Sequence, residues 1–189
     1  MRRAGLKLLG AAALAATLVP GWAGAEVENL GPGGFTVALQ RDIRAEPKDV
    51  YAALTERVSH WWESDHSWSG DAANLYVDAT PGGCFCERLE NGGWVEHLRV
   101  IYLAPGQELR LRGSLGPLMD LGLVGTMIWR LEPVEREATD VSPRRTDTRF
   151  TWRYVVQGHM AGGFEQLAPV VDRVNATQLD RLAALFGSG

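Results

Sequence analysis

The sequence of 189 residues predicts an α+β domain, with a strongly curved antiparallel β-sheet wrapped around a long C-terminal helix and two short helices after the first strand. Three observations predict it. Apolar and polar residues alternate with strand periodicity in many segments between residues 35 and 156. Asn91-Gly92 lies between two such runs and favours the tight turn of a β-hairpin, because both residues tolerate positive φ. The segment from Leu167 to Leu185 has an apolar stripe at helical spacing, and a sheet with one apolar face needs such a cover.

The N-terminal elements follow from periodicity and from one proline. Residues 35–44 alternate and predict the first strand. Pro47 suits the first position of a helix, because its fixed φ is helical and its missing N–H has no partner there anyway. A second short helix is expected between residues 56 and 63, and a short second strand between residues 75 and 80.

The Asn91-Gly92 turn sets a register for the strands beside it. With a two-residue turn, Glu87 lies opposite Glu96, and side chains alternate between the two faces of the hairpin. The apolar face, which we expect to be the inner one, carries Phe85, Glu87, Leu89, Trp94, Glu96, Leu98, Val100 and Tyr102. The opposite face carries Cys84, Cys86, Arg88, Val95, His97, Arg99 and Ile101.

A second predicted hairpin supports the same inner face. The chain turns again at residues 104–107, which favour a turn because they include Pro and Gly. Pairing across this turn places Val100 opposite Leu111 and Tyr102 opposite Leu109. Two independent turns therefore gather the apolar residues on one side of the sheet.

The later segments complete the sheet and its cover. Residues 114–124 are apolar, Gly-rich and irregular, and could form a lid or a short helix over an opening. Strands are expected at 125–131 and 148–156, separated by a polar loop at 132–147. The closing helix should end near Phe186.

Residues 1–25 have the features of a cleaved secretory signal. A basic start precedes an apolar run from Leu8 to Val19, and Ala23-Gly24-Ala25 fits a cleavage site. The run is too short and too rich in Ala for a membrane span, so no stable membrane insertion is expected after cleavage. We therefore expect an exported protein, periplasmic or secreted, with residues 26–34 as a linker and 35–189 as a single domain.

The charge of the exported chain excludes two classes of partner. Cleavage removes three of the 19 basic residues and none of the 23 acidic ones, which leaves a net charge of −7. An acidic domain is a poor candidate for binding nucleic acid or an anionic membrane.

The order of elements and five segments resemble one superfamily. The segments are RDIRAEPKDVYAALTE, PGGCFCERLENGGWVEHLRV, TMIWRLEP, RFTWRYVVQG and the closing helix. Together they resemble the SRPBCC superfamily (START-like, helix-grip proteins), which includes polyketide cyclase-like and Hsp90-activator-homology proteins, and in particular its exported uncharacterised members. The resemblance extends from Phe35 to Phe186. It implies a helix-grip fold with a cavity between the sheet and the last helix, and it supplies no shared catalytic motif.

The predicted function is the binding of a small hydrophobic or aromatic ligand in that cavity. Its walls would be Leu98, Val100, Tyr102, Trp129, Trp152 and Tyr154, with Trp94 beside the glutamates. Leu118 to Leu123 would gate access, and Glu87 and Glu96 would orient a polar end of the ligand. We expect no cofactor and no bound metal, and the sequence identifies no partner protein.

The glutamate pair leaves alternatives open. Two carboxylates facing each other inside a sheet need a shared proton, an inward cation such as Arg41, or a polar ligand; otherwise they lie at a solvated rim. A buried pair could also transfer protons in a cyclase- or dehydratase-like enzyme, although no independent catalytic motif is present. A third possibility is a structural envelope protein whose interior is filled by side chains.

Two further clusters have alternative interpretations. Cys84, Cys86 and His97 would lie together as free thiols with a histidine, as a local disulfide, or as weak metal ligands. A disulfide would need a bulge at Gly82-Gly83, because residues two apart in a regular strand are ~6.5–7 Å apart at Cα, the outer limit for bridging. The second cluster surrounds Trp61, Trp62 and Trp68 and could be the rim of a pocket mouth or ordinary packing; it contains His60, Asp65, His66 and Asp71.

Overall fold

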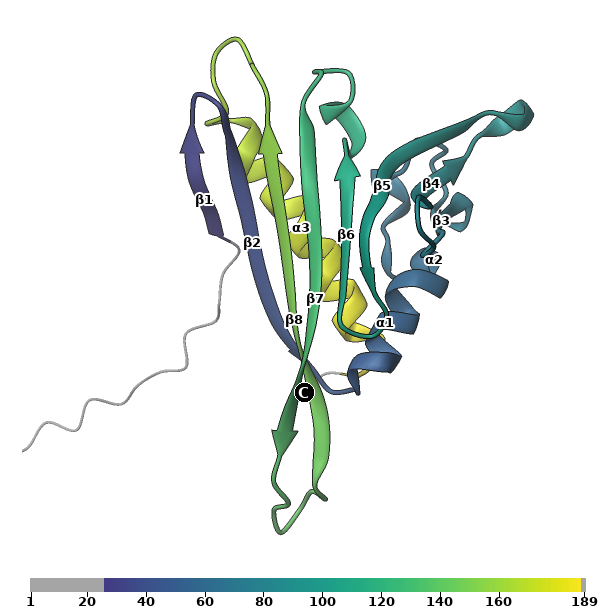
Figure 1. The fold of residues 1–189 in the computed structure, drawn as a ribbon, viewed down its shortest axis with the longest axis vertical. Helices are drawn as coiled ribbons and strands as arrows, with labels where there is room; N and C mark the ends of the chain where they lie inside the picture. The colour runs from purple at the N-terminus through teal and green to yellow at the C-terminus, as the bar shows by residue number, and fades with distance from the viewer. Residues whose placement is uncertain (1–25, 188–189) are drawn as a thin grey trace, which may run out of the picture.

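The computed structural model describes residues 26–187, which form one antiparallel sheet with α3 across one of its faces (Figure 1). The strand order is β1-β2-β8-β7-β6-β5-β4-β3, and the sheet is open because its edge strands β1 and β3 do not pair with each other. The strands are β1 (Glu26–Gly31), β2 (Gly34–Ile43), β3 (Leu75–Val77), β4 (Cys84–Arg88), β5 (Trp94–Ala104), β6 (Glu108–Gly113), β7 (Val124–Arg136) and β8 (Arg145–Gln157). The helices are α1 (Pro47–Glu56), α2 (Val58–Trp61), α3 (Leu167–Ala184) and the short 3-10 helices η1 (Ser64–His66), η2 (Ala72–Asn74), η3 (Glu90–Gly92) and η4 (Gly116–Leu118).

The predicted fold class is confirmed. An antiparallel sheet, two short helices after its long first hairpin and a long C-terminal helix are all present. Pro47 occupies the start of α1, as its fixed φ favours. Leu179 and Leu182 on α3 are fully buried, so the apolar stripe of this helix faces the sheet.

The expected linker at residues 26–34 is wrong. Residues Glu26–Gly31 form β1, which pairs antiparallel with β2, and Val27 packs against the core. Strand pairing satisfies the backbone hydrogen bonds that a free linker would leave to water. The signal predicted for residues 1–25 lies outside the described residues. In the part that the structure describes, no helix is both long enough and apolar enough to cross a membrane.

The polar loop expected at 132–147 is shorter than predicted. β7 and β8 continue beyond the end of β2 as a two-stranded extension, visible below the rest of the sheet in Figure 1. Ion pairs stabilise this polar ladder: Arg136 binds Asp147 at 3.0 Å and Asp42 at 2.6 Å, and Arg145 binds Asp147 at 2.8 Å. The polar composition of residues 132–147 therefore predicted a loop, but much of this segment forms strands that ion pairs between charged side chains stabilise.

The predicted two-residue turn between β4 and β5 is wrong. Asn91 and Gly92 do have positive φ, but they belong to η3 within a longer connection that is closed by the Leu89 N–H donating to the Gly93 carbonyl. Phe85 still lies opposite Leu98, as the register predicted.

A bulge follows this correctly predicted pair. The register shifts between Phe85 and Cys86, so that Glu87 pairs with Val95 and not with Glu96. His97 is the additional residue on β5, and its side chain turns inward while that of Glu96 does not.

The second hairpin is paired as predicted only on the side of a second bulge that lies away from the turn. Val100 lies opposite Leu111, as predicted, but the register shifts between Val100 and Tyr102. Tyr102 therefore lies opposite Arg110 and points away from the core, with the Arg110 guanidinium 4.9 Å from its ring centroid. The predicted pairing of Tyr102 with Leu109 is wrong, because one extra residue reverses the faces that follow it.

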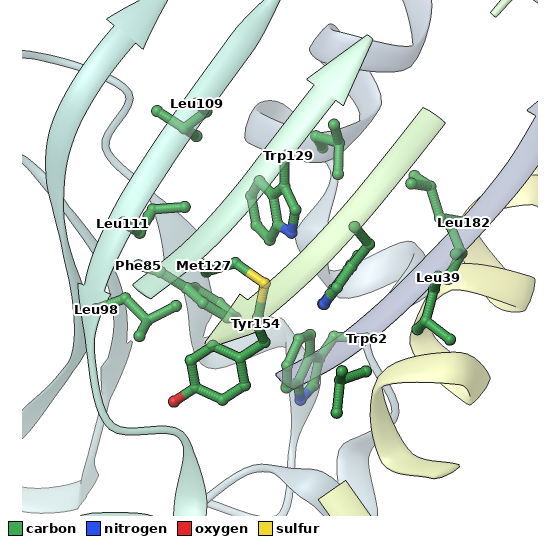
Figure 2. Close-up of a cluster of buried hydrophobic side chains, with 14 of the residues drawn as sticks. Leu39, Trp62, Phe85, Leu98, Leu109, Leu111, Met127, Trp129, Tyr154 and Leu182 are labelled. Atoms are coloured by element: carbon green, nitrogen blue, oxygen red, sulfur yellow. The ribbon is translucent and has the colours of Figure 1, made fainter. Parts of the chain in front are cut away.

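Aromatic side chains pack against one another in the space between the sheet and α3. Trp129 and Trp152 lie 5.2 Å apart between ring centroids, and Trp61 packs edge-on at 6.0 Å from each. The Trp152 indole N–H donates to Asn175 of α3 at 2.8 Å. Figure 2 shows the core residues of β5 to β8 packed beside Trp62, Phe85 and Leu182.

Candidate ligand-binding groove

A groove of about 380 Å³ opens where α3 meets two loops, and we call it the α3 groove. One loop contains η1 and the other contains η4. Its lining consists mainly of aromatic and aliphatic side chains with a few polar ones. The lining residues are Trp62, Asp65, His66, Ser67, Trp68, Leu115, Gly116, Pro117, Leu118, Asp120, Leu167, Val170, Val171, Val174 and Asn175.

The helical wall of the groove comes from the first half of α3. Leu167, Val170, Val171 and Val174 follow one another at helical spacing and therefore share one face. Val170 is 48% exposed although it is aliphatic. This face of α3 is thus only partly covered by the rest of the chain.

The aromatic wall comes from the segment after α2. Trp62 is buried, packs 5.0 Å from Phe85 and donates its indole N–H to the His66 carbonyl at 2.9 Å. Ser67 donates its hydroxyl to the Ser64 carbonyl at 2.7 Å, which tightens η1. The chain then presents Trp68 at the surface, 45% exposed.

The third wall is the loop that contains η4. Leu118 and Leu123 are buried and anchor it, and the Leu123 N–H donates to the Leu118 carbonyl at 3.0 Å. The Leu115 N–H donates to the Tyr154 hydroxyl at 3.3 Å, which ties the loop to β8. Met119 and Leu121 stay exposed at its tip. The segment expected to gate an opening therefore forms one side of a groove.

The described polar residues of the groove include two carboxylates and no Lys or Arg. Asp65 and Asp120 are exposed carboxylates, and His66 Nδ1 lies 2.9 Å from Glu63 Oε2. Asn175 is buried and accepts the hydrogen bond from Trp152. None of the described residues that line the groove is Lys or Arg.

A buried carboxylate holds the backbone behind the aromatic wall. Glu87 is fully buried and accepts hydrogen bonds from the backbone N–H groups of Trp68, at 3.0 Å, and Ser69, at 2.5 Å. Its Oε2 also lies 3.0 Å from His97 Nε2. Glu87 therefore links β4, β5 and the loop that carries Trp68.

The environment sets the protonation states of this pair. Burial alone would raise the pKa of Glu87, but hydrogen bonds from Ser69, Trp68 and His97 together hold that pKa below its usual range. Burial lowers the pKa of His97 by more than the neighbouring Glu87 raises it. At neutral pH Glu87 is therefore charged and His97 neutral, with its proton on Nε2 facing the carboxylate. His97 Nδ1 is buried and has no hydrogen-bond partner among the described residues.

Comparisons with known proteins give a fold and no family. No family model and no curated protein matches the chain. Protein MLL2253 from Mesorhizobium loti is similar in structure, with a TM-score of 0.53 and 16% identity over 79% of this chain and 95% of that one. A conserved protein of unknown function from Enterococcus faecalis, EF2215, has a TM-score of 0.53 and 14% identity over 85% of this chain and 75% of that one. CalU16 from Micromonospora echinospora has a TM-score of 0.50 and 14% identity over 82% of this chain and 75% of that one.

The shared fold is the helix-grip fold. Its predicted interior site is only partly as expected. Leu98, Val100, Trp129, Trp152 and Tyr154 do face the space between sheet and α3, where all five are buried in the core. Their contact with a ligand stays a prediction.

The other predicted site residues do not share that space. Glu96 binds Arg99 outside the core, so Glu87 has no carboxylate partner and the proton-transfer chemistry predicted for this pair lacks its second member. Trp94 is 59% exposed beside the η3 connection, and Tyr102 is exposed on the outer face. Placing these three residues inside is wrong because the two bulges reverse the alternation on which it depended.

The cysteine cluster is resolved as a disulfide. Cys84 and Cys86 are bonded to each other, with their Cα atoms 5.4 Å apart. His97 lies on the inner face with Glu87, so a metal site formed by these three residues is wrong. Across the described residues no group of three or more potential ligands is placed to hold a metal ion.

Sequence reasoning missed the inward position of His97, although one signal pointed to it. A disulfide between residues two apart requires an irregular strand, but the bulge lies between Phe85 and Cys86 and not at Gly82-Gly83, where it was expected. Of the two interpretations of the aromatic segment, ordinary packing describes Trp61, which is buried in the core, whereas Trp62 and Trp68 line the groove. No feature of the sequence indicated that Val170 of α3 lines the groove. An exposed aliphatic position on a helix differs from a buried one only in what packs against it.

Proposed function

We propose that this protein binds a small hydrophobic or aromatic molecule in the α3 groove. One observation carries the proposal: a groove of about 380 Å³ has aromatic and aliphatic walls that stay partly exposed, with Trp68 and Val170 near half exposure. Binding sites for small molecules are concave, mainly apolar and supplied with a few polar groups, and this groove has each feature.

The proposal keeps the predicted ligand class but moves its site. The interior between sheet and α3 holds Trp61, Trp129 and Trp152 in mutual contact, whereas the groove lies at the edge of that core. Trp62 belongs to both, because it lines the groove and packs on Phe85. A bound ligand would therefore extend the core outward over the first half of α3.

A neutral fluorescent probe, phenylnaphthylamine, tests the proposal. We expect a saturable rise in its fluorescence with the purified protein, because an apolar groove removes the probe from water. Val170→Asp places a charge in the helical wall and should abolish saturable binding.

Val141→Asp is the matched control. It is the same substitution at a residue that is 95% exposed and outside the lining of the groove. Binding that does not saturate, or that responds equally to the two substitutions, would overturn the proposal.

We also propose that the mature protein works outside the cytoplasm. The signal-like features of residues 1–25 support this, and so does the Cys84–Cys86 disulfide, because disulfides persist in oxidising compartments. Expression of the full chain in a Gram-negative host should give a periplasmic product whose mass corresponds to a chain beginning at Glu26. A product of full-length mass in the cytoplasm would overturn it.

A further inference from the structure

We propose that the ligand of the α3 groove is an organic cation, with an apolar or aromatic body in the groove and an ammonium group against Asp65, Asp120 and the ring of Trp68. This inference rests on the proposed function and specifies its ligand class.

The first argument is the charge of the lining. Asp65 and Asp120 are the carboxylates that line the groove, and neither has an ion-pair partner among the described residues. His66 contributes no uncompensated positive charge, since it faces Glu63 at 2.9 Å. Two unpaired negative charges beside an apolar surface attract a cation and repel an anion.

The second argument is the position of the basic residues. The described lining of the α3 groove contains no Lys or Arg, whereas a different groove beside the β7–β8 extension is lined by Arg44, Arg136 and Arg145. Arg136 and Arg145 there are already engaged by Asp147. An anionic amphiphile would therefore find no counter-charge in the α3 groove.

The third argument is the free face of Trp68. Three other aromatic rings are each covered by an arginine of the same chain: Phe186 by Arg57, Tyr76 by Arg88 and Tyr102 by Arg110. In the described part of the chain no such cation lies over Trp68, which is 45% exposed and lines the groove. Tryptophan is the best aromatic partner for a cation, so this ring is available to one from outside.

Three isosteric probes test the inference: naphthylmethylammonium, neutral naphthylmethanol and anionic naphthoate, each competing with phenylnaphthylamine. We expect the cation to bind about five- to tenfold more tightly than the alcohol at low salt, since exposed charge contacts and one cation–π contact are each modest. The anion should bind more weakly than the alcohol. The preference for the cation should shrink as salt is raised.

Charge removal assigns the preference to the groove. The double variant Asp65→Asn and Asp120→Asn should lose most of the preference for the cation, keep the part that the ring of Trp68 supplies, and keep its affinity for naphthylmethanol. The control, Glu137→Gln with Asp140→Asn, removes two exposed charges from the β7–β8 connection, outside the lining of the groove, and should keep the preference.

The outcomes separate the two proposals. Saturable binding with equal affinities for all three probes overturns the cation inference and leaves the proposed function standing. An undiminished preference in the Asp65 and Asp120 double variant also overturns the inference. If no probe binds saturably, the proposed function itself fails.

Discussion

At the scale of single residues, Glu87 shows how a charge can be kept inside a sheet. A buried carboxylate is costly unless hydrogen bonds replace its water. Here two backbone N–H groups and His97 supply them, and no second carboxylate is needed. The residue thus fixes the loop that carries Trp68 to the inner face of β4.

Glu87→Gln should therefore destabilise the fold. The amide keeps one acceptor oxygen but replaces the other with an NH₂ group. This donor then faces an N–H group from which the carboxylate oxygen accepted a hydrogen bond. We expect a loss of about 2 kcal/mol in the free energy of unfolding, measured by urea denaturation. Glu96→Gln is the control, because Glu96 pairs with Arg99 at the surface, and its loss should stay below about 1 kcal/mol. Equal losses would show that Glu87 is not the buried anchor.

The same pair predicts an acid-sensitive stability. The folded pKa of His97 is lowered, so the unfolded chain takes up a proton below pH ~6.5 while the folded chain does not. The folded pKa of Glu87 is also lowered, so its contribution is present above the unfolded value and is lost as pH falls through the folded one. Stability should therefore decrease as pH falls from 7.5 to 5 (about the range in which histidine titrates) and decrease again in stronger acid.

Urea midpoints across that pH range give the measurement. His97→Gln should reduce the pH dependence, because it removes the group that titrates only in the unfolded chain. His159→Gln, at an exposed loop residue, should leave it unchanged. An undiminished slope in His97→Gln would contradict the assignment.

At the scale of elements, the sequence predicted the pairings on the far side of each bulge and failed between the bulge and the turn. Phe85 with Leu98 and Val100 with Leu111 were correct because the extra residue of each bulge offsets a one-residue error in the pairing predicted next to the turn. One extra residue then moved His97 inward and Tyr102 outward. A bulge depends on contacts made by other segments, such as Trp68 and Ser69 on Glu87, and local sequence does not contain those contacts.

The disulfide in β4 gives a prediction about this irregular hairpin. The bond closes a ring of only three residues, from Cys84 to Cys86, so it restricts the unfolded chain little. In the chain-entropy description a ring of this size contributes about 1.5 kcal/mol. Replacing both cysteines with serine should lower the free energy of unfolding by that amount and leave probe binding in the α3 groove intact.

Reduction supplies the control for this prediction. A dithiol reductant should destabilise the natural protein as much as the double serine substitution and should not affect the double variant. A loss of more than about 4 kcal/mol, beyond the expected range for so short a ring, would mean that the disulfide maintains the bulge and the Glu87–His97 contact.

At the scale of the whole molecule, the inner face was predictable but the occupancy of the interior was not. Alternation along the strands correctly placed Trp129, Trp152 and Tyr154 between the sheet and α3. Whether that space is open depends on Trp61, which arrives from α2 and contacts two of these rings. The position of Trp61 depends on how α2 packs in the assembled fold, and no periodicity in the strands predicts it.

Trp129→Ala decides whether these side chains form a core or the walls of an open cavity. In a packed core the substitution removes contacts on all sides and leaves a void, so we expect a loss of about 3–5 kcal/mol in the free energy of unfolding. In an open cavity the indole would already lack neighbours on one side, and the loss would be much smaller. Trp94→Ala, at a residue 59% exposed, controls for the loss of an indole and should cost less than about 1 kcal/mol.

Because Trp129 does not line the α3 groove, the affinity for phenylnaphthylamine should be unchanged in the folded variant. A small loss of stability together with weakened probe binding would instead return the ligand to the interior between the sheet and α3.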